Sequence, residues 1–254
     1  MLLLLNIEKE TIFSLMEWSR DNDQEALIKY LDAIGIPLGI LRYLRSRILW
    51  GERVVTICKH LGRDEEADWY LIRDVAWSLV RMGTEDSRRR ALQLLMEAKE
   101  RADQKGWTRN LALALRNLGS LAMDDNDYDK AQEHLNISVM LWQKVDEPFF
   151  EMITRQAMAS LAMRRGNLEA AKDFYAALLA DYQEIGDVNG KIEVMASLAL
   201  ANAQQGNYAE ARDTSDHSIG LAEQIKYPAY IRGFVYQRRS EIEELQHNLE
   251  EAIE

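Results

Sequence analysis

Four histidines and one cysteine are the side chains most able to bind a metal or act as a nucleophile. The histidines are His60, His134, His217 and His247. Each falls in a different predicted helical segment, and none has a second His or Cys at a chelating spacing. A zinc site needs three or four convergent ligands, so we expect no metal site. Cys58 lies between Ile57 and Lys59 in a predicted helix, where a buried, small apolar role is the more common one.

Acidic pairs and one glycine-containing segment are the remaining candidates for catalysis. Asp124/Asp125 and Glu243/Glu244 fall in a predicted turn and on a polar helix face, whereas a catalytic carboxylate pair needs an enclosing pocket. Residues 186–192 approach a phosphate-binding loop, but the segment is one residue short and lacks the hydroxyl residue. We therefore expect a non-enzymatic chain that requires no cofactor.

The composition limits the class of protein. The 254 residues include 31 Lys+Arg and 42 Asp+Glu, for a formal net charge of −11, with 3 Pro and 13 Gly. So few turn residues argue against a long all-β fold. The negative charge argues against a general nucleic-acid or anionic-membrane binder. The single cysteine excludes an intrachain disulfide framework.

The start of the chain lacks the features of a targeting segment. Leu2–Leu5 form a short apolar run, and Glu8, Lys9 and Glu10 follow. A signal peptide needs a basic start, a longer apolar run and a small-residue cleavage site. No apolar stretch approaches the roughly 18–20 residues that span a bilayer. We expect a cytoplasmic protein whose leucine run starts or caps a helix, or marks a cut inside a longer protein.

Two arginine clusters are candidates for nucleic-acid contacts. They are Arg88-Arg89-Arg90 and the set Arg42, Arg45 and Arg47. Acidic residues alternate with the first cluster, and nucleic-acid binding needs a broad basic face. We therefore expect both clusters to be solvated and ion-paired. The tryptophans are expected to fill gaps between helices.

A period of 40 residues organises the chain from about residue 68. It is carried by alanines, by aromatic or aliphatic residues three positions earlier, and by small residues in a preceding segment. These sets are Ala131, Ala171 and Ala211; Tyr128, Leu168 and Tyr208; and Gly119, Ala159 and Ala199. Apolar residues recur at spacings of three and four on both sides of a polar turn, which predicts two helices per unit. The small residues allow the two helices to cross closely.

This pattern resembles the tetratricopeptide repeat (TPR), a helix–turn–helix unit of 34 residues. Leu118-Gly119, Ala122, Ala131 and Leu135 stand where that family places its leucine–glycine pair, its small or aromatic position, its central alanine and its aromatic position. The resemblance implies an all-α fold: an α-solenoid of TPR-like repeats that forms a superhelix with a concave groove. The groove would bind a protein or peptide, with no nucleic acid and no membrane as partner.

The expected boundaries follow from the period. We expect an N-terminal helical region with divergent helix pairs at 1–66, repeats at about 67–106, 107–146, 147–186 and 187–226, and a partial repeat at 227–254. Before the repeats, helices are expected near 7–18, 23–34, 38–48 and 50–61, with Pro37 as a break. Asn248–Ala252 repeats Asn167–Ala171, so a new helix is expected to begin there. This interrupted unit predicts that the chain is a fragment of a longer protein.

The resemblance also implies a ligand-contacting set on the first helix of each pair. Carried onto this chain, the set is Asp74, Arg81, Leu113, Arg116, Asn117, Ser120, Met123, Gln156, Ser160 and Met163. Asn117 stands where peptide-binding members often carry an asparagine that holds the ligand backbone, although Ala157 and Ser197 occupy the matching positions. We expect Arg116, Asn117 and Gln156 to point into one channel. The alternative is that these are ordinary solvent-facing helix residues.

A second resemblance covers about 50 residues at the front. Glu10–Trp18 and Trp50-Gly51-Glu52-Arg53 are similar to the helices that bridge the ATPase module to the TPR array in bacterial STAND (NB-ARC-type) signalling ATPases. The resemblance implies a sensor arm that binds a ligand or partner, with an ATPase module in the same full-length chain. The alternative is a free-standing TPR adaptor that recruits a peptide or scaffolds a complex.

Overall fold

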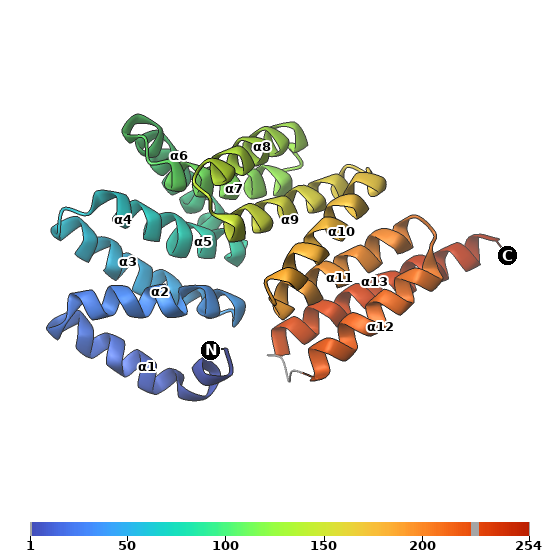
Figure 1. Cartoon of the computed structure of the whole chain (residues 1–254), viewed down its shortest axis with the longest axis horizontal. Helices are drawn as coiled ribbons and strands as arrows, with labels where there is room; N and C mark the ends of the chain where they lie inside the picture. Colours follow the sequence, from blue (N-terminus) through green and yellow to red (C-terminus); the bar gives the residue numbers. More distant parts are fainter. Residues whose placement is uncertain (1, 225–228, 254) are drawn as a thin grey trace. The chain divides into compact units, whose positions relative to one another are not determined.

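The computed structural model describes residues 2–224 and 229–253, and every regular element in those residues is a helix (Figure 1). The elements up to residue 105 are α1 (Leu2–Asn22), α2 (Gln24–Ile40), α3 (Leu44–His60), α4 (Asp64–Tyr70), the π-helix η1 (Leu71–Ala76), α5 (Trp77–Met82) and α6 (Glu85–Lys105). They are followed by α7 (Thr108–Asp124), α8 (Tyr128–Lys144), α9 (Pro148–Arg164), α10 (Leu168–Glu184), α11 (Val188–Gln204), α12 (Tyr208–Gln224) and α13 (Ala229–Ile253). The predicted all-α repeat array is confirmed.

The repeats have nearly constant helix lengths. Helices α2, α3 and α7–α12 each contain 17 residues. From α7 to α12 successive helices begin 20 residues apart, for example 128 − 108 = 20. We call the first helix of each pair the A helix and the second the B helix. The A helices include α7, α9 and α11, and their B helices are α8, α10 and α12.

A recurring three-residue turn sets this length. The middle residue of the turn is left-handed, as in Gly166 with φ of 75°. The next residue, Asn167, donates its N–H to the carbonyl of Ala162 at 2.9 Å, which is the Schellman pattern that ends a helix. The Asn167 side chain then accepts from the N–H of Ala170 and caps the next helix. One short sequence pattern therefore ends one helix and begins another.

Small residues bring the two helices of a pair together. A Cβ placed on Gly119 would lie 2.9 Å from Cγ of Leu135 on the B helix. Ala131, Ala171 and Ala211 have no exposed surface. The close crossings predicted from these positions are confirmed.

The front of the chain differs from the prediction. Helix α2 continues through Pro37 to Ile40, so the predicted break at Pro37 and the predicted helix at 38–48 are wrong. The turn comes at residues 41–43, where Arg42 has φ of 62° and Tyr43 donates to the carbonyl of Leu38. The starts at 24, 44 and 64 keep the 20-residue step, so the repeat geometry already begins at residue 24.

One A helix contains a π-turn. The helices α4, η1 and α5 run without a break from 64 to 82, and the following B helix, α6, begins at 85. That start lies 85 − 64 = 21 residues after the start of α4, one more than the 20-residue step of α2–α4 and of α7–α12. A π-turn holds one extra residue inside a helix, which accounts for the difference.

The last helix also differs from the prediction. Helix α13 is continuous from 229 to 253, so the turn predicted before Asn248 is wrong. His247 stands where the corresponding turn has the left-handed Gly166, and a non-glycine residue pays a penalty there. Pro148 is the first residue of α9, a position where proline is favoured, and Pro228 lies outside the described residues.

The chain divides into two compact units, Met1–Glu147 and Pro148–Glu254. In the first unit the core gathers residues from α1 to α4, with Met16, Leu27 and Leu31 completely buried. In the second unit, two clusters run along α9–α12, and Ile242 of α13 joins one of them. None of the described helices is long and apolar enough to cross a membrane.

Candidate functional site

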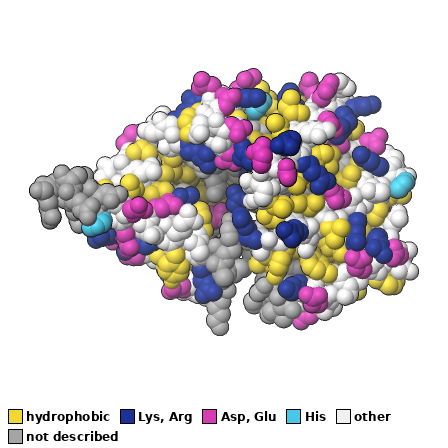
Figure 2. Space-filling model, turned by 180° about the vertical axis from the view of Figure 1, so that it is seen from behind, with side chains coloured by type: hydrophobic (Ala, Val, Ile, Leu, Met, Phe, Trp, Pro, Cys, Tyr) yellow, Lys and Arg dark blue, Asp and Glu magenta, His cyan; other side chains and the backbone are white. Residues whose placement is uncertain are grey.

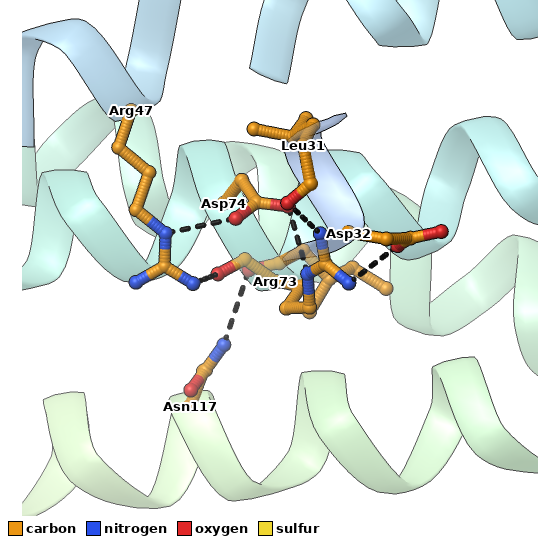
Figure 3. Close-up of polar contacts among 7 residues, drawn as sticks. Leu31, Asp32, Arg47, Arg73, Asp74 and Asn117 are labelled. Carbon is orange, nitrogen blue, oxygen red and sulfur yellow. Dashed lines mark hydrogen bonds and ion pairs between the residues drawn. The ribbon is translucent and has the colours of Figure 1, made fainter. Parts of the chain in front are cut away.

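A buried cluster of charges surrounds η1 in the first unit (Figure 3). Asp74 is fully buried, and its Oδ1 accepts from Nε of Arg47 at 2.8 Å. Its Oδ2 accepts from Nε of Arg73, also at 2.8 Å. Arg73 then reaches Oδ1 of Asp32 on α2 at 2.9 Å. The cluster joins α2, α3 and η1 through two guanidiniums and two carboxylates, so its formal charge is balanced.

The π-turn supplies one of the acceptors in this cluster. The N–H of Trp77 bonds to the carbonyl of Ile72, five residues earlier. In an α-helix that N–H would bond to the carbonyl of Arg73. This carbonyl instead accepts from Nη2 of Arg47 at 2.8 Å. The local helix geometry therefore creates a backbone acceptor for a buried arginine.

Glycines make the room for these side chains. A Cβ on Gly35 would lie 2.6 Å from Oδ1 of Asp74, and one on Gly39 would lie 2.4 Å from Nη1 of Arg47. The Arg47 guanidinium also stacks 4.4 Å from the centre of the Trp77 ring, a favourable cation–π arrangement. Burial lowers the pKa of Arg47, and Asp74 opposes that shift. For Arg73, burial alone would lower the pKa, but Asp74 and Asp32 together raise it.

Asn117, the predicted ligand-binding asparagine, binds a backbone carbonyl of its own chain. It is 1% exposed, and its Nδ2 donates to the carbonyl of Ile72 at 3.4 Å. Seven residues earlier on α7, Asn110 makes the same kind of bond to the carbonyl of Glu65 at 2.8 Å. The two asparagines thus fasten α7 to the preceding A helix. Nη1 of Arg116 donates to Oδ1 of Asn117.

The other predicted residues of the first unit fall into two groups. Asp74, Leu113 and Met123 are buried and take part in packing. Arg81 is exposed, and Arg116 and Ser120 are half-buried. Burial therefore leaves Arg81, Arg116 and Ser120 as the members of the set that present surface in this unit.

The predicted residues of the second unit all present surface. Gln156, Ser160 and Met163 on α9 are half-buried, as is the neighbouring Ile153. Because α9 is the A helix with the fewest buried residues among α7, α9 and α11, it offers a mixed polar and apolar strip. We call Ile153, Gln156, Ser160 and Met163 the α9 strip.

Two tyrosines from the B helix support this strip. The hydroxyl of Tyr182 donates to Oε1 of Gln156 at 3.0 Å, and the hydroxyl of Tyr175 lies 3.4 Å from Oγ of Ser160. Both tyrosines are 2% exposed, and burial raises the pKa of Tyr175. Gly190 on α11 makes room for Tyr182, because a Cβ there would lie 2.3 Å from the ring. The two buried tyrosines of α10 therefore restrict the conformations of Gln156 and Ser160 on α9.

These two tyrosines were not predicted as functional residues from the sequence. They occupy the positions of Leu135 and Trp142 in the preceding repeat. The sequence signal that could have identified them is a tyrosine at two positions of the 40-residue period that are buried in the other repeats. A buried Tyr hydroxyl needs a hydrogen-bond partner, so each tyrosine predicts a polar side chain beside it.

The two front motifs of the second resemblance touch each other in the first unit. Nη1 of Arg53 lies 2.7 Å from Oε1 of Glu17, and the rings of Phe13 and Trp50 are 6.4 Å apart. Arg53 also stacks over Trp50 at 4.4 Å. The helix that was predicted to begin at Trp50 begins at Leu44. Trp50–Arg53 therefore lies in the middle of α3.

The surface charges are mixed. On the face shown in Figure 2, basic and acidic side chains are interspersed. Arg88, Arg89 and Arg90 all form ion pairs with acidic residues, which confirms the expectation for that cluster. Arg47 is also ion-paired, with Asp74, but it is 3% exposed, so its expected solvation is wrong.

Among the described residues, no group of three or more His, Cys, Asp or Glu could hold a metal ion. Cys58 is buried, and burial raises the pKa of its thiol to about 11.

These features define an α-solenoid of TPR-like repeats with a supported strip on one A helix. No protein-family model matches the chain, and no curated protein matches it. Among solved structures, the apo form of RapI is similar over 88% of this chain and 86% of its own, with 13% identity and a TM-score of 0.52. A Podosopora anserina chain of nearly identical TPR-like repeats, described as a kinesin light chain, is similar over 82% of this chain and 97% of its own. That match has 16% identity and a TM-score of 0.53. Both similarities show the fold.

Proposed function

We propose that this chain is a non-catalytic repeat domain that binds a protein or peptide partner through the α9 strip. The observation that carries the proposal is the pair of hydrogen bonds between Tyr182 and Gln156 and between Tyr175 and Ser160. These bonds hold polar side chains in fixed positions beside the apolar Ile153 and Met163. Preorganised polar groups next to apolar contacts favour binding, because less side-chain entropy is lost.

A substitution of Gln156 can test ligand binding without removing the hydrogen bond from Tyr182. Its Oε1 accepts from Tyr182, so the amide Nε2 is the group that would donate to a ligand carbonyl. Gln156→Glu keeps an acceptor for Tyr182 and removes the amide donor. Ligand affinity should fall about tenfold, equivalent to about 1.4 kcal/mol, while the thermal midpoint of unfolding changes little.

The experiment is a selection of binders from a random peptide library, followed by calorimetric titration of the selected peptides. The control is Ala177→Glu, which adds a charge to the exposed face of α10. Equal affinities for the wild type, Gln156→Glu and the control would place binding elsewhere. Equal losses in both variants would indicate a general charge effect.

The finer proposal is that the domain serves as the sensor arm of a STAND-type ATPase or related bacterial regulator. It is supported by the resemblance at the front and by the Glu17–Arg53 ion pair that joins its two motifs. The free-standing adaptor remains the alternative. A Walker motif encoded upstream in the same reading frame would favour the sensor arm, and its absence from the complete reading frame would favour the adaptor.

A further inference from the structure

The α11–α12 pair carries a polar residue at two core positions of the repeat. Asn202 of α11 stands where α7 has Ala122 and α9 has Ala162. Ser215 of α12 stands where the B helices α8 and α10 have a buried leucine and a buried tyrosine. Neither Asn202 nor Ser215 has any exposed surface. One amide and one hydroxyl therefore lie in the core of the second unit.

These two residues come from facing segments of neighbouring helices. The helices α11 and α12 pack against each other in the second unit (Figure 1). In the α7–α8 pair, a Cβ on Gly119 would lie 2.9 Å from Cγ of Leu135, and the corresponding residues of α11 and α12 are Ala199 and Ser215. Asn202 follows Ala199 by three residues, so it lies on the same side of α11 and faces the same stretch of α12.

Both side chains lack a hydrogen-bond partner in the part of the chain that the structure describes. Neither Nδ2 nor Oδ1 of Asn202 has one, and Oγ of Ser215 has none. Other serines of the second unit behave differently, because Ser160 and Ser197 each donate to a carbonyl four residues earlier on the same helix. The Ser215 hydroxyl makes no such bond, so it is open to a partner from outside its own helix.

The surroundings of Asn202 supply no polar side chain. The core cluster at this crossing contains Ala199, Ala203 and Ala211. Unpaired amide and hydroxyl groups would oppose folding, because water satisfies both in the unfolded chain. Buried polar groups in native proteins are bonded to protein or to ordered water. Ser215 is also smaller than the leucine or tyrosine of the preceding repeats, and a water molecule is small enough to replace the missing carbon atoms.

We propose that the core of the second unit contains an internal water site, in which a water molecule bridges Asn202 and Ser215. The water accepts from Nδ2 of Asn202 and donates to Oγ of Ser215. Internal waters typically make about three hydrogen bonds to buried polar groups, and these two residues supply three polar atoms. The bridge joins α11 to α12 at the position where the earlier repeats have a large B-helix side chain.

A double-mutant cycle tests the bridge, because the two side chains do not bond to each other directly. Asn202→Ala, Ser215→Ala and the double variant are unfolded in urea, and circular dichroism reports the equilibrium constant of unfolding. If a water joins the two residues, either single substitution breaks the bridge, and the second substitution then has a smaller effect. The product of the two single effects should differ from the effect of the double variant by about fivefold or more.

Ser218 provides the matched control. It is also fully buried on α12, but its Oγ donates to the backbone carbonyl of Ser215. The effects of Ser218→Ala and Asn202→Ala should therefore multiply without coupling. Coupling of the same size in this pair would mean that any change in the core of α12 affects Asn202, and the bridge would be rejected.

A high-resolution crystal structure of the whole chain is the second measurement. Density for an ordered water should lie within hydrogen-bond distance of Asn202 and Ser215 in the wild type, and should be missing in the double variant. A wild-type core without this density, or with a direct bond between the two side chains, would overturn the proposal. A cycle that shows no coupling between Asn202 and Ser215 would do the same.

Discussion

The buried charge cluster of the first unit depends on one side chain, that of Asp74. Its carboxylate has no exposed surface and accepts from both Arg47 and Arg73. Removal of one partner from a buried ion pair leaves an uncompensated charge in a medium that solvates it poorly. The two arginines therefore depend on this carboxylate more than any surface ion pair depends on its partner.

We expect Asp74→Asn to lower the free energy of unfolding by about 3–5 kcal/mol, because the side chain keeps its shape but loses its charge. Urea titration followed by circular dichroism measures the effect. The control is Asp32→Asn, since the Asp32 side chain is 52% exposed and a solvated ion pair contributes about 1 kcal/mol or less. Equal effects of the two substitutions would mean that burial does not govern the energetics of the cluster.

Sequence reasoning placed some residues correctly and not others. The alanines of the 40-residue period were predicted at helix crossings, and Ala131 and Ala171 are buried. Asn117 and Asp74 were assigned to a ligand surface because they lie on the expected face of an A helix. The period fixes the face of a helix, but the preceding helix decides which residues on that face are covered. No local pattern reports that Ile72 and Arg73 present carbonyls to Asn117 and Arg47.

At the scale of the element, the three-residue turn is the part of the fold that the sequence predicts most directly. A left-handed middle residue and a capping Asn or Asp recur through the repeats. Where this pattern is absent, the predictions made from other signals were wrong. Pro37 was treated as a break but is accommodated inside α2, and His247 does not supply the turn that a glycine would.

Asp146 tests the energetics of this turn. It adopts φ of 55° at the position that Gly166 and Gly186 occupy in later turns. Asp146→Gly should raise the free energy of unfolding by up to about 1 kcal/mol, since glycine removes the roughly 1–2 kcal/mol penalty of a left-handed L residue but loses about 0.5–1 kcal/mol more conformational entropy on folding. Chemical denaturation measures the gain. The reciprocal change, Gly166→Ala, should lower stability by a similar amount, and a loss of stability in Asp146→Gly would show that the aspartate side chain matters more than its backbone conformation.

At the scale of the whole molecule, the division into Met1–Glu147 and Pro148–Glu254 is the feature that sequence periodicity does not reveal. The 40-residue step continues across residue 147 without a change in helix length. Whether neighbouring repeats form one compact unit depends on how many contacts they share, and those contacts exist only in the folded chain. In repeat proteins, stability is approximately a sum of such local contributions.

We therefore expect Ala171→Arg to destabilise the second unit selectively. Ala171 has no exposed surface, so the substitution overpacks the α9–α10 crossing and buries an unpaired charge, at a penalty of about 3 kcal/mol or more. Hydrogen exchange should increase throughout α9–α13 and change little in α1–α6. Ala177→Arg, on the exposed face of α10, should leave both regions as in the wild type. Uniform loss of protection over the whole chain would mean that the two units unfold together.

The π-turn at Leu71–Ala76 also has a consequence for how the chain tolerates changes of length. An extra residue in an α-helix rotates everything after it by about 100°, since the helix has 3.6 residues per turn. Here one wide turn takes up the extra residue, and Ser78 and Leu79, which follow it, are buried. An alignment of these repeats therefore needs a one-residue gap inside the helix and not in a loop. Gene shuffling that joins repeats across residues 71–76 without that gap would turn the apolar face of α5 toward water.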